Sequence, residues 1–409
     1  MSSIVGRGGE PGPARPLMAR GLLSGVTVLS LEQATTLPFL TYRLACDGAR
    51  VIRVEHAERP DPNRFVGHDV LAEPAMRSYF LPNNCGKEAI TLNLDHPDGQ
   101  ALLRALIVKL PVDVFACNQR TRSYARLGIE PERLLAVKSD LIWLGITGFG
   151  PEHDEAAYDP VLQARAGFMD LTGDAGGPPT VFGLPMVDLG AAEHGYSEVV
   201  KALYRRATTG EGARIDVSML RSAVSWMVAP ITLAGSLGER VTRKGNRHQF
   251  FAPVAVHRTR DGHVYLAVGN DQQWAALTAL SGFAGLARPE YAANAGRIAD
   301  VDRLDRALAD CFADLGTAEA LESLRRAGVP VSRVSTLADV AADPLVAERL
   351  VQVTDPRSGL RLALPAPPVG EPPVLSFPPR LGEHNEKIYV DALGLTPERL
   401  AELRRRQIV

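Results

Sequence analysis

Hydrophobic and polar positions follow an alternating rhythm through the first 150 residues. Short apolar runs of β-forming residues occur at residues 25–30, 49–55, 89–94, 112–115 and 141–147. Segments with helical spacing lie between them, at residues 38–47, 97–110 and 131–137. Strands that alternate with helices of this length are typical of βαβ units and of a mainly parallel sheet. We therefore predict an α/β fold for this part of the chain.

The pattern changes in the second half. Residues 255–258 and 264–268 resemble two strands joined by the turn around Gly262, and helical spacing follows at residues 273–280, 301–313 and 318–327. This order predicts a smaller α+β domain. We divide the chain into a disordered leader (1–20), the first part of a large α/β domain (21–225), a small α+β domain (226–330), and a connector that returns to the large domain (331–409).

The connector is proline-rich between residues 365 and 379, as an extended segment would be, and residues 397–406 predict a last short helix. The formal net charge of −2 gives no general electrostatic reason to bind nucleic acid or an anionic membrane. No apolar run approaches the roughly 20 residues that a membrane span needs. We expect neither nucleic acid nor membrane as a partner.

Motifs for the commonest cofactors and metals are absent from the sequence. It has no P-loop, HExxH or GxSxG motif, and residues 33–38 (QATTLP), after the first strand, lack the GxGxxG of dinucleotide-binding proteins. The four cysteines are scattered without a CxxC pair, which fits a reducing cytoplasm, and the surroundings of Cys46, Cys85 and Cys117 favour packing roles. We expect no metal and no permanently bound cofactor.

Residues 148–188 are dense in glycine and proline and must contain much loop structure. Phe168, Met169 and Phe182 argue against disorder, so a functional loop is expected. Asp188 lies where this loop meets a helical pattern. Taken alone, its surroundings favour a helix N-cap, a position at which Asp is common. Local sequence therefore gives Asp188 a structural role rather than a catalytic one.

A longer series of motifs changes that interpretation. Their order and spacing resemble the class III CoA transferases, the family of formyl-CoA transferase, over nearly the whole chain beyond the leader. In chain order, the matching motifs are Pro38, NCGK at 84–87, Asn118, RLG at 126–128, GFG at 148–150, Tyr158-Asp159-Pro160, Leu171-Thr172-Gly173, Asp188, GVP at 328–330 and LGEH at 381–384. Each motif is weak by itself, and the ordered set is specific.

The resemblance implies a Rossmann-like large domain, a smaller domain and an interlocked homodimer. It also implies an enzyme whose substrates are an acyl-CoA and a carboxylic acid, with Asp188 as the nucleophile. Family positions along the CoA site match Lys87, Asn118, Arg126 and Leu127. To these we add Arg120, which brings positive charge to the same loop, and Tyr158, which lies on the motif.

The chemistry explains why one aspartate is enough. A desolvated carboxylate held against a thioester can form a mixed anhydride, and the released CoA thiolate can convert it into an aspartyl-CoA thioester. Each step develops an oxyanion, which backbone N–H groups of a glycine-rich segment would stabilise. A helix N-terminus at Asp188 would, in addition, keep the carboxylate ionised.

Two departures from the family bear on the reaction. Residues 245–253 (GNRHQFFAP) replace the glycine-rich run that covers the formyl-CoA transferase site, so substrate and lid behaviour should differ. Related α-methylacyl-CoA racemases have a His where this chain has Tyr158, which argues against racemisation. A racemase-like isomerase and a non-catalytic CoA-binding protein remain the alternatives. His153 and His194 lie near Asp188 in sequence but off the motif, and we expect each to be a surface or structural residue.

Substrate identity is less constrained. Arg120, Arg165 and Arg247 could recognise a second carboxylate, as in a C4 or C5 dicarboxylate such as succinate, mesaconate or itaconate. Solvated surface arginines would give the same sequence. A transfer between the two carboxyl groups of one diacid is open by the same chemistry.

Overall fold

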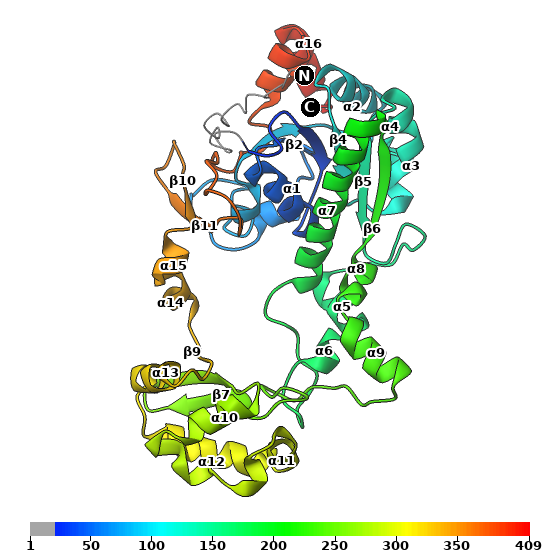
Figure 1. The fold of residues 1–409 in the computed structure, drawn as a ribbon. Helices are drawn as coiled ribbons and strands as arrows, with labels where there is room; N and C mark the ends of the chain where they lie inside the picture. The colour runs from blue at the N-terminus through cyan, green and yellow to red at the C-terminus, as the bar shows by residue number, and fades with distance from the viewer. Residues whose placement is uncertain (1–20) are drawn as a thin grey trace, which may run out of the picture. The chain divides into compact units, whose positions relative to one another are not determined.

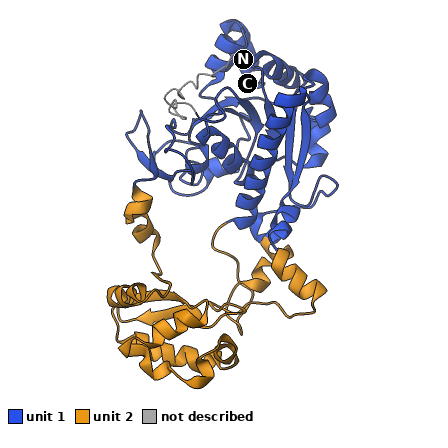
Figure 2. Ribbon diagram, viewed as in Figure 1, with its two compact units in different colours: residues 1–162, 185–227, 348–409 blue, residues 163–184, 228–347 orange. Residues whose placement is uncertain are grey.

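The computed structural model describes residues 21–409 and divides the chain into two compact units (Figure 2). Unit 1 comprises residues up to 162 together with 185–227 and 348–409, and unit 2 comprises 163–184 and 228–347. The predicted leader, residues 1–20, lies outside the described residues. Unit 2 takes in residues 163–184 and continues past the expected boundary at residue 330.

Unit 1 is built on a six-stranded sheet with the strand order β3-β2-β1-β4-β5-β6. All of its neighbouring strands are parallel, which confirms the predicted α/β fold with a parallel sheet. The strands are β1 (Thr27–Leu31), β2 (Arg50–Glu55), β3 (Lys87–Thr91), β4 (Val114–Cys117), β5 (Ile142–Thr147) and β6 (Ala213–Ser218).

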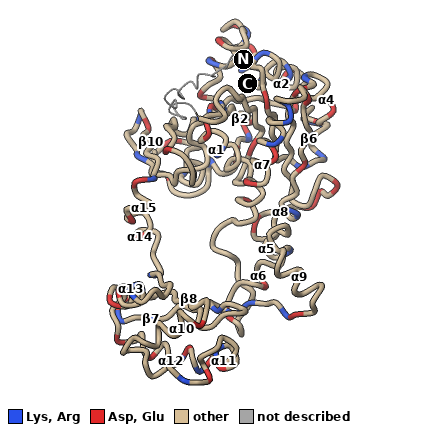
Figure 3. The backbone as a smooth tube through the Cα atoms, viewed as in Figure 1, with Lys and Arg blue, Asp and Glu red and all other residues tan. Residues whose placement is uncertain are grey.

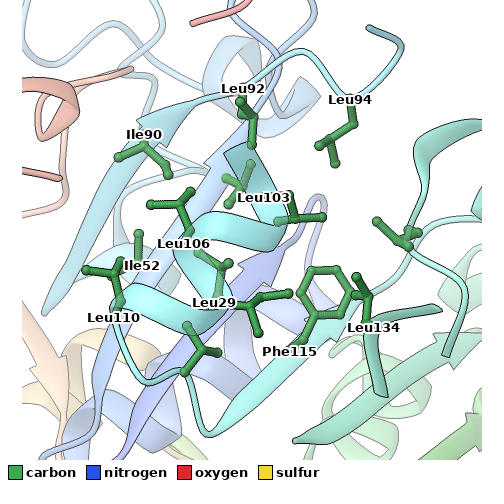
Figure 4. Packing of buried hydrophobic residues seen from close by; sticks show 14 of the residues in the cluster. Leu29, Ile52, Ile90, Leu92, Leu94, Leu103, Leu106, Leu110, Phe115 and Leu134 are labelled. Atoms are coloured by element: carbon green, nitrogen blue, oxygen red, sulfur yellow. The ribbon is translucent and has the colours of Figure 1, made fainter. Parts of the chain in front are cut away.

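Helices cover both faces of this sheet (Figure 1). Helix α1 (Thr36–Cys46) packs against α7 (Met186–Thr209) on one face, and α7 also lies on β5 and β6. On the other face Leu103, Leu106 and Leu110, in and just after α2 (Pro97–Lys109), point toward strand residues such as Leu29 and Phe115 (Figure 4). That core also takes in α4 (Pro131–Val137) and α16 (Pro397–Arg405), so the chain does return to unit 1.

Unit 2 has a three-stranded antiparallel sheet in the order β7-β8-β9. Its core holds Val264 and Leu266 against helical residues such as Leu304, Leu308 and Phe312, which is the predicted α+β arrangement. The elements are β7 (Val254–Thr259), β8 (Gly262–Ala267), β9 (Val331–Arg333), α10 (Asp271–Thr278), α11 (Asn294–Ala299), α12 (Val301–Ala313), α13 (Thr317–Arg326), α14 (Leu337–Ala342) and α15 (Pro344–Ala347).

Shorter elements complete the chain. The α-helices are α2 (Pro97–Lys109), α3 (Tyr124–Leu127), α5 (Asp159–Arg165), α6 (Phe168–Leu171), α8 (Met219–Ser225) and α9 (Val228–Ser236), and β10 (Leu350–Thr354) pairs with β11 (Arg361–Pro365). Five 3₁₀ turns lie at Pro62–Phe65, Pro82–Asn84, Thr121–Ser123, Ser281–Leu286 and Pro289–Tyr291, and a π-helical segment at Glu386–Ala392. Most of the proline-rich run, residues 366–379, lies outside helices and strands.

Charged residues of both signs are interspersed along the backbone of each unit (Figure 3). Of the helices in residues 21–409, none combines the length and the apolar character needed to cross a membrane.

Candidate active site

The order of the sheet places a topological switch point between β1 and β4, because the chain leaves these neighbouring strands toward opposite sides of the sheet. Ligands of open α/β sheets bind outside the carboxyl ends of strands at such a point. Here Asn118 bridges the two loops. Its Oδ1 accepts from the Gln33 N–H at 3.1 Å, and its Nδ2 donates to the Gln33 carbonyl at 2.8 Å.

The loop after β1 is held firmly in an uncommon conformation. Ala34 has a φ of 61°, in the left-handed region that non-glycine residues rarely adopt. Its N–H donates to Asp61 at 3.0 Å, and its carbonyl accepts from Asn63 at 2.7 Å. These hydrogen bonds on both sides of Ala34 fix where α1 begins, and with it the position of Thr36.

Asp188 meets Thr36 at the start of α7. The Thr36 hydroxyl donates to Asp188 Oδ1 at 2.5 Å, joining residues 152 positions apart. Asp188 is the third residue of α7, after Met186 and Val187, and the N-cap position belongs to Pro185. The N-cap role that local sequence favoured for Asp188 is therefore wrong.

The amides at the start of α7 are bound by a different carboxylate. Asp159 Oδ1 accepts from the N–H groups of Val187 at 2.7 Å and Asp188 at 3.1 Å. Burial raises the pKa of Asp188 to about 6, against a lowering by the Thr36 hydrogen bond and with a further rise from the Asp159 charge. We expected the helix N-terminus to stabilise this carboxylate, but burial raises its pKa, and the amides of Val187 and Asp188 are bound by Asp159 instead.

Replacing Asp188 by Asn is expected to stabilise the protein at neutral and higher pH. The pKa of Asp188 rises from 3.8 to about 6 on folding, so its ionised form costs folding free energy. The cost is up to about 3 kcal/mol, complete above the folded pKa and absent below the unfolded one. Thermal unfolding at about pH 8 should favour D188N, and the two proteins should converge near pH 4. Equal stability of both proteins at the higher pH would contradict the raised pKa.

A pocket lies at the carboxyl ends of β1, β2 and β3 and against α3. Of the residues predicted to contact CoA, Arg126 and Leu127 line it. Arg126 forms an ion pair with Asp95, which also pairs with Arg59 at 2.5 Å. The remaining lining residues are Leu31, Glu32, Gln33, Val54, Glu55, His56, Pro60, Asp61, Leu92, Leu94 and Gln119. Arg59 and Arg126 thus bring two guanidinium groups to this pocket, both paired with Asp95.

The other predicted contacts have varied surroundings. Arg120 is exposed in the loop after β4, and Tyr158, next to Asp159, is 73% exposed. Asn118 connects the two loops at the switch point, as described above. Lys87 is 1% exposed, and its Nζ donates to Glu32 at 2.7 Å, to the Pro38 carbonyl at 2.9 Å and to Asn84. In this arrangement the Lys87 ammonium faces protein groups rather than solvent.

Lys87 belongs to a buried ionic network beneath the pocket. Burial lowers the pKa of Lys87 to about 8, against the opposing effect of the Glu32 carboxylate. Arg53, also fully buried, lies 3.6 Å from Glu32, 3.0 Å from Glu55 and 3.1 Å from Asp61. Since Asp61 also holds the Ala34 amide, the network connects to the loop that positions Thr36.

Arg247 and His194, two further residues considered from the sequence, already have hydrogen-bond partners within the protein. Arg247, considered for a second carboxylate, donates to Asp305 at 2.6 Å and to Asp302 at 2.7 Å within unit 2. His194 bonds Ser222 through Nδ1 at 2.6 Å and accepts from the Trp226 indole at 3.2 Å. Arg165, the third arginine of that set, is exposed. Among residues 21–409, no group of three His, Cys, Asp or Glu side chains is arranged to hold a metal ion.

Sequence reasoning missed three groups, two that contact Asp188 and one that lines the pocket at the strand ends. Thr36 carries no motif, and its link to Asp188 depends on the packing of α1 against α7. Arg59 follows β2 in an ordinary polar loop. Asp159 was visible as part of the motif Tyr158-Asp159-Pro160, but only the fold shows that it binds the start of α7. No local pattern would have found the first two.

The chain was compared with known proteins. Residues 23–385 match the model of CoA-transferase family III. An acetyl-CoA:oxalate CoA-transferase from Acetobacter aceti is 34% identical over 83% of this chain and 87% of its own length. A succinate–glutarate CoA-transferase from Agrobacterium fabrum is 30% identical over 90% of this chain and 95% of its own length.

A solved structure agrees with these matches. The crystal structure of a CAIB/BAIF family protein from Brucella suis superposes with a TM-score of 0.81 at 30% identity, covering 91% of this chain and all of that chain. The family match spans both compact units, so it concerns the whole arrangement and not one domain. The chain is a member of CoA-transferase family III, an enzyme that transfers CoA to carboxylic acids.

Proposed function

We propose that Asp188 is the nucleophile through which this enzyme moves CoA from an acyl-CoA to a free carboxylic acid. The observation that carries the proposal is the environment of its carboxylate. It is partly withdrawn from water, it is held by a single hydroxyl from α1, and its pKa is raised to about 6 by burial. Such a carboxylate is ionised at neutral pH and more nucleophilic than a solvated one.

The reaction proceeds in four displacements. The Asp188 carboxylate attacks the thioester carbonyl, the C–S bond breaks, and a mixed anhydride and CoA thiolate result. The thiolate attacks the aspartyl carbonyl of the anhydride, giving an aspartyl-CoA thioester and releasing the first acid. The acceptor carboxylate attacks that thioester and regenerates a mixed anhydride. The thiolate then attacks the acyl carbonyl of the acceptor, so acyl-CoA leaves and Asp188 is restored.

Every displacement exchanges one anion for another, so the cycle needs no net proton transfer. The Thr36 hydroxyl can stabilise the carboxylate before attack and again when Asp188 is restored. An α-proton abstraction would instead need a base at the reacting carbon, and the racemase His position is occupied by Tyr158. Solvent deuterium entering the α-carbon of an acyl-CoA without an acceptor acid would favour the isomerase instead.

The pocket at the ends of β1 to β3 is proposed to receive the nucleotide end of CoA, with Arg126 at a phosphate. Arg126→Ala is then expected to weaken CoA binding about tenfold, the usual scale for one exposed charge-assisted contact. Isothermal titration with CoA and with dephospho-CoA measures the change. Arg133→Ala is the matched control, because Arg133 is a similarly exposed arginine that does not line the pocket. Equal CoA affinities of the two variants would show that Arg126 does not contact CoA.

The acids are proposed to include small dicarboxylates. Curated relatives are named for oxalate and for succinate and glutarate. Arg120 and Arg165 remain the candidates for a second carboxylate, whereas Arg247 is occupied by Asp302 and Asp305. Incubation of the enzyme with succinyl-CoA or acetyl-CoA and a panel of mono- and dicarboxylates, followed by chromatography of the CoA esters, tests this. Transfer to monocarboxylates alone would discard the dicarboxylate proposal, and no transfer to any acid would contradict the function.

A homodimer is proposed from the family and from helix α9. This helix is mostly apolar yet has no buried residue in the single chain, and Val228 and Ile231 are 71% and 49% exposed. An apolar helix in this state suits an interface with a second copy. Sedimentation equilibrium should give twice the chain mass, and a monomer at micromolar concentration would contradict the proposal.

A reducing cytoplasm remains the proposed location, and Cys46, Cys85 and Cys117 are buried thiols that burial makes less acidic.

A further inference from the structure

Asp159 does at a distance what an N-cap residue normally does locally. Its side chain is buried, with 6% of the residue exposed. One of its carboxylate oxygens accepts from two successive amides, those of Val187 and Asp188, at 2.7 and 3.1 Å. Pro185, at the N-cap position, provides no side-chain acceptor for these groups. The start of α7 is therefore held by a residue almost thirty positions earlier in the chain.

This arrangement places two carboxylates at one turn of helix. Asp188 lies at the third position of α7, where free helix amides would stabilise a negative charge. Its own N–H and that of Val187 are directed to Asp159 instead. The Asp188 carboxylate accepts instead from the Thr36 hydroxyl, its one hydrogen-bond donor among residues 21–409.

We propose that Asp159 is a positioning residue for Asp188, which fixes the first turn of α7 and withholds its amides from the nucleophile. This inference rests on the proposed role of Asp188. Withholding the amides leaves Asp188 less stabilised as an anion, and a less stabilised anion attacks a thioester more readily. Fixing the turn keeps the carboxylate in the orientation that the reaction needs.

The other charged groups around α7 have partners other than Asp188. Elements packed against this helix are α1, α8, β5 and β6. Strand β5 has no ionisable residue, and the α1 groups Tyr42 and Cys46 pack in a separate core cluster. The charged residues on the other elements, with their partners, are Arg43 of α1 with Glu193, Arg221 of α8 with Glu152, and Asp216 of β6 with Arg214. His194 of α7 is bound to Ser222 and Trp226.

The test separates the two effects of Asp159 by comparing two variants. Asp159→Asn keeps an oxygen that can accept from both amides but removes the charge. Asp159→Ala removes the oxygen and the charge. Titration of Asp carboxyl carbons by NMR, with Asp188 assigned by its loss in D188N, follows the nucleophile without any substrate. The midpoint for Asp188 should move to lower pH in D159N, because a neighbouring negative charge has been removed.

Kinetics supply the second readout. D159A is expected to lower kcat by about 10²-fold through misplacement of the nucleophile, and D159N should lose less and shift the acidic limb of its pH–rate profile downward. Asp339→Asn, at the capping box of α14 in unit 2, is the control for removing a capping carboxylate and should leave the Asp188 titration unchanged. The Asp188 midpoint should fall further in D159A, which also frees the two amides, and an identical midpoint in D159A and the parent protein would overturn the inference. A shifted midpoint in a protein that transfers no CoA would retain the inference on Asp159 and reject the proposed function.

Discussion

Asp188→Ala is expected to abolish CoA transfer, lowering kcat by at least about 10³-fold, because the variant has no group on which to form the anhydride. The methyl group of Ala leaves the Thr36 hydroxyl in place but cannot accept its hydrogen bond. The effect should fall on kcat rather than on CoA affinity, since Asp188 does not line the pocket at the strand ends. Steady-state transfer assays and CoA titrations measure the two quantities separately.

Asp188→Glu and Thr36→Val separate the position of the carboxylate from its hydrogen bond. Glu keeps the nucleophile but displaces it by one methylene, so a partial loss is expected. Val keeps the shape of Thr36 and removes only the hydrogen bond to the carboxylate. Turnover by Asp188→Ala within tenfold of the parent enzyme would contradict the assignment of Asp188 as the nucleophile.

Lys87→Met is expected to destabilise the protein by about 3–5 kcal/mol, since it leaves the fully buried Glu32 without its nearest cation. Arg53 remains, but its Nη1 is 3.6 Å from Glu32, compared with 2.7 Å for the Lys87 ammonium. Chemical denaturation measures the loss. Any weaker CoA binding should follow from the disturbed loop after β1 and not from a lost contact with phosphate.

The double variant Glu32→Gln with Lys87→Met provides the control. Removing both charges together should recover much of the stability lost in Lys87→Met, because no uncompensated carboxylate then remains in the interior. Normal stability of Lys87→Met combined with a large loss of CoA affinity would contradict this account. Lys87 would then be a ligand contact, as the resemblance implies.

The sheet was predictable because its signals are local. Strands β1 to β5 are short, largely buried runs, and helices such as α2 show their own spacing, so residues 27–31 or 97–109 could be found without tertiary information. The hairpin of β10 and β11 was not found, because it directly precedes the proline-rich run and residues 331–409 are predicted together as an extended connector. Its packing against Phe80 and Phe377 is a long-range effect.

The chemistry of the site was less predictable than its location. The ordered motifs indicated Asp188, but its local sequence indicated a helix cap, and its true surroundings come from Thr36 and Asp159. Both contacts join residues far apart in the chain. Lys87 shows the same limit, since a lysine in a motif can face a ligand or a buried glutamate, and only the packing of β3 behind the loop after β1 decides between them.

Chemical trapping of the aspartyl-CoA thioester tests the central proposal most directly. The enzyme would be incubated with an acyl-CoA, treated with borohydride and digested, and the peptide that contains Asp188 examined by mass spectrometry. Reduction of Asp188 to homoserine is expected, dependent on acyl-CoA and absent in D188N. An unmodified Asp188 during full turnover, or a reduced thioester at any other residue, would contradict it.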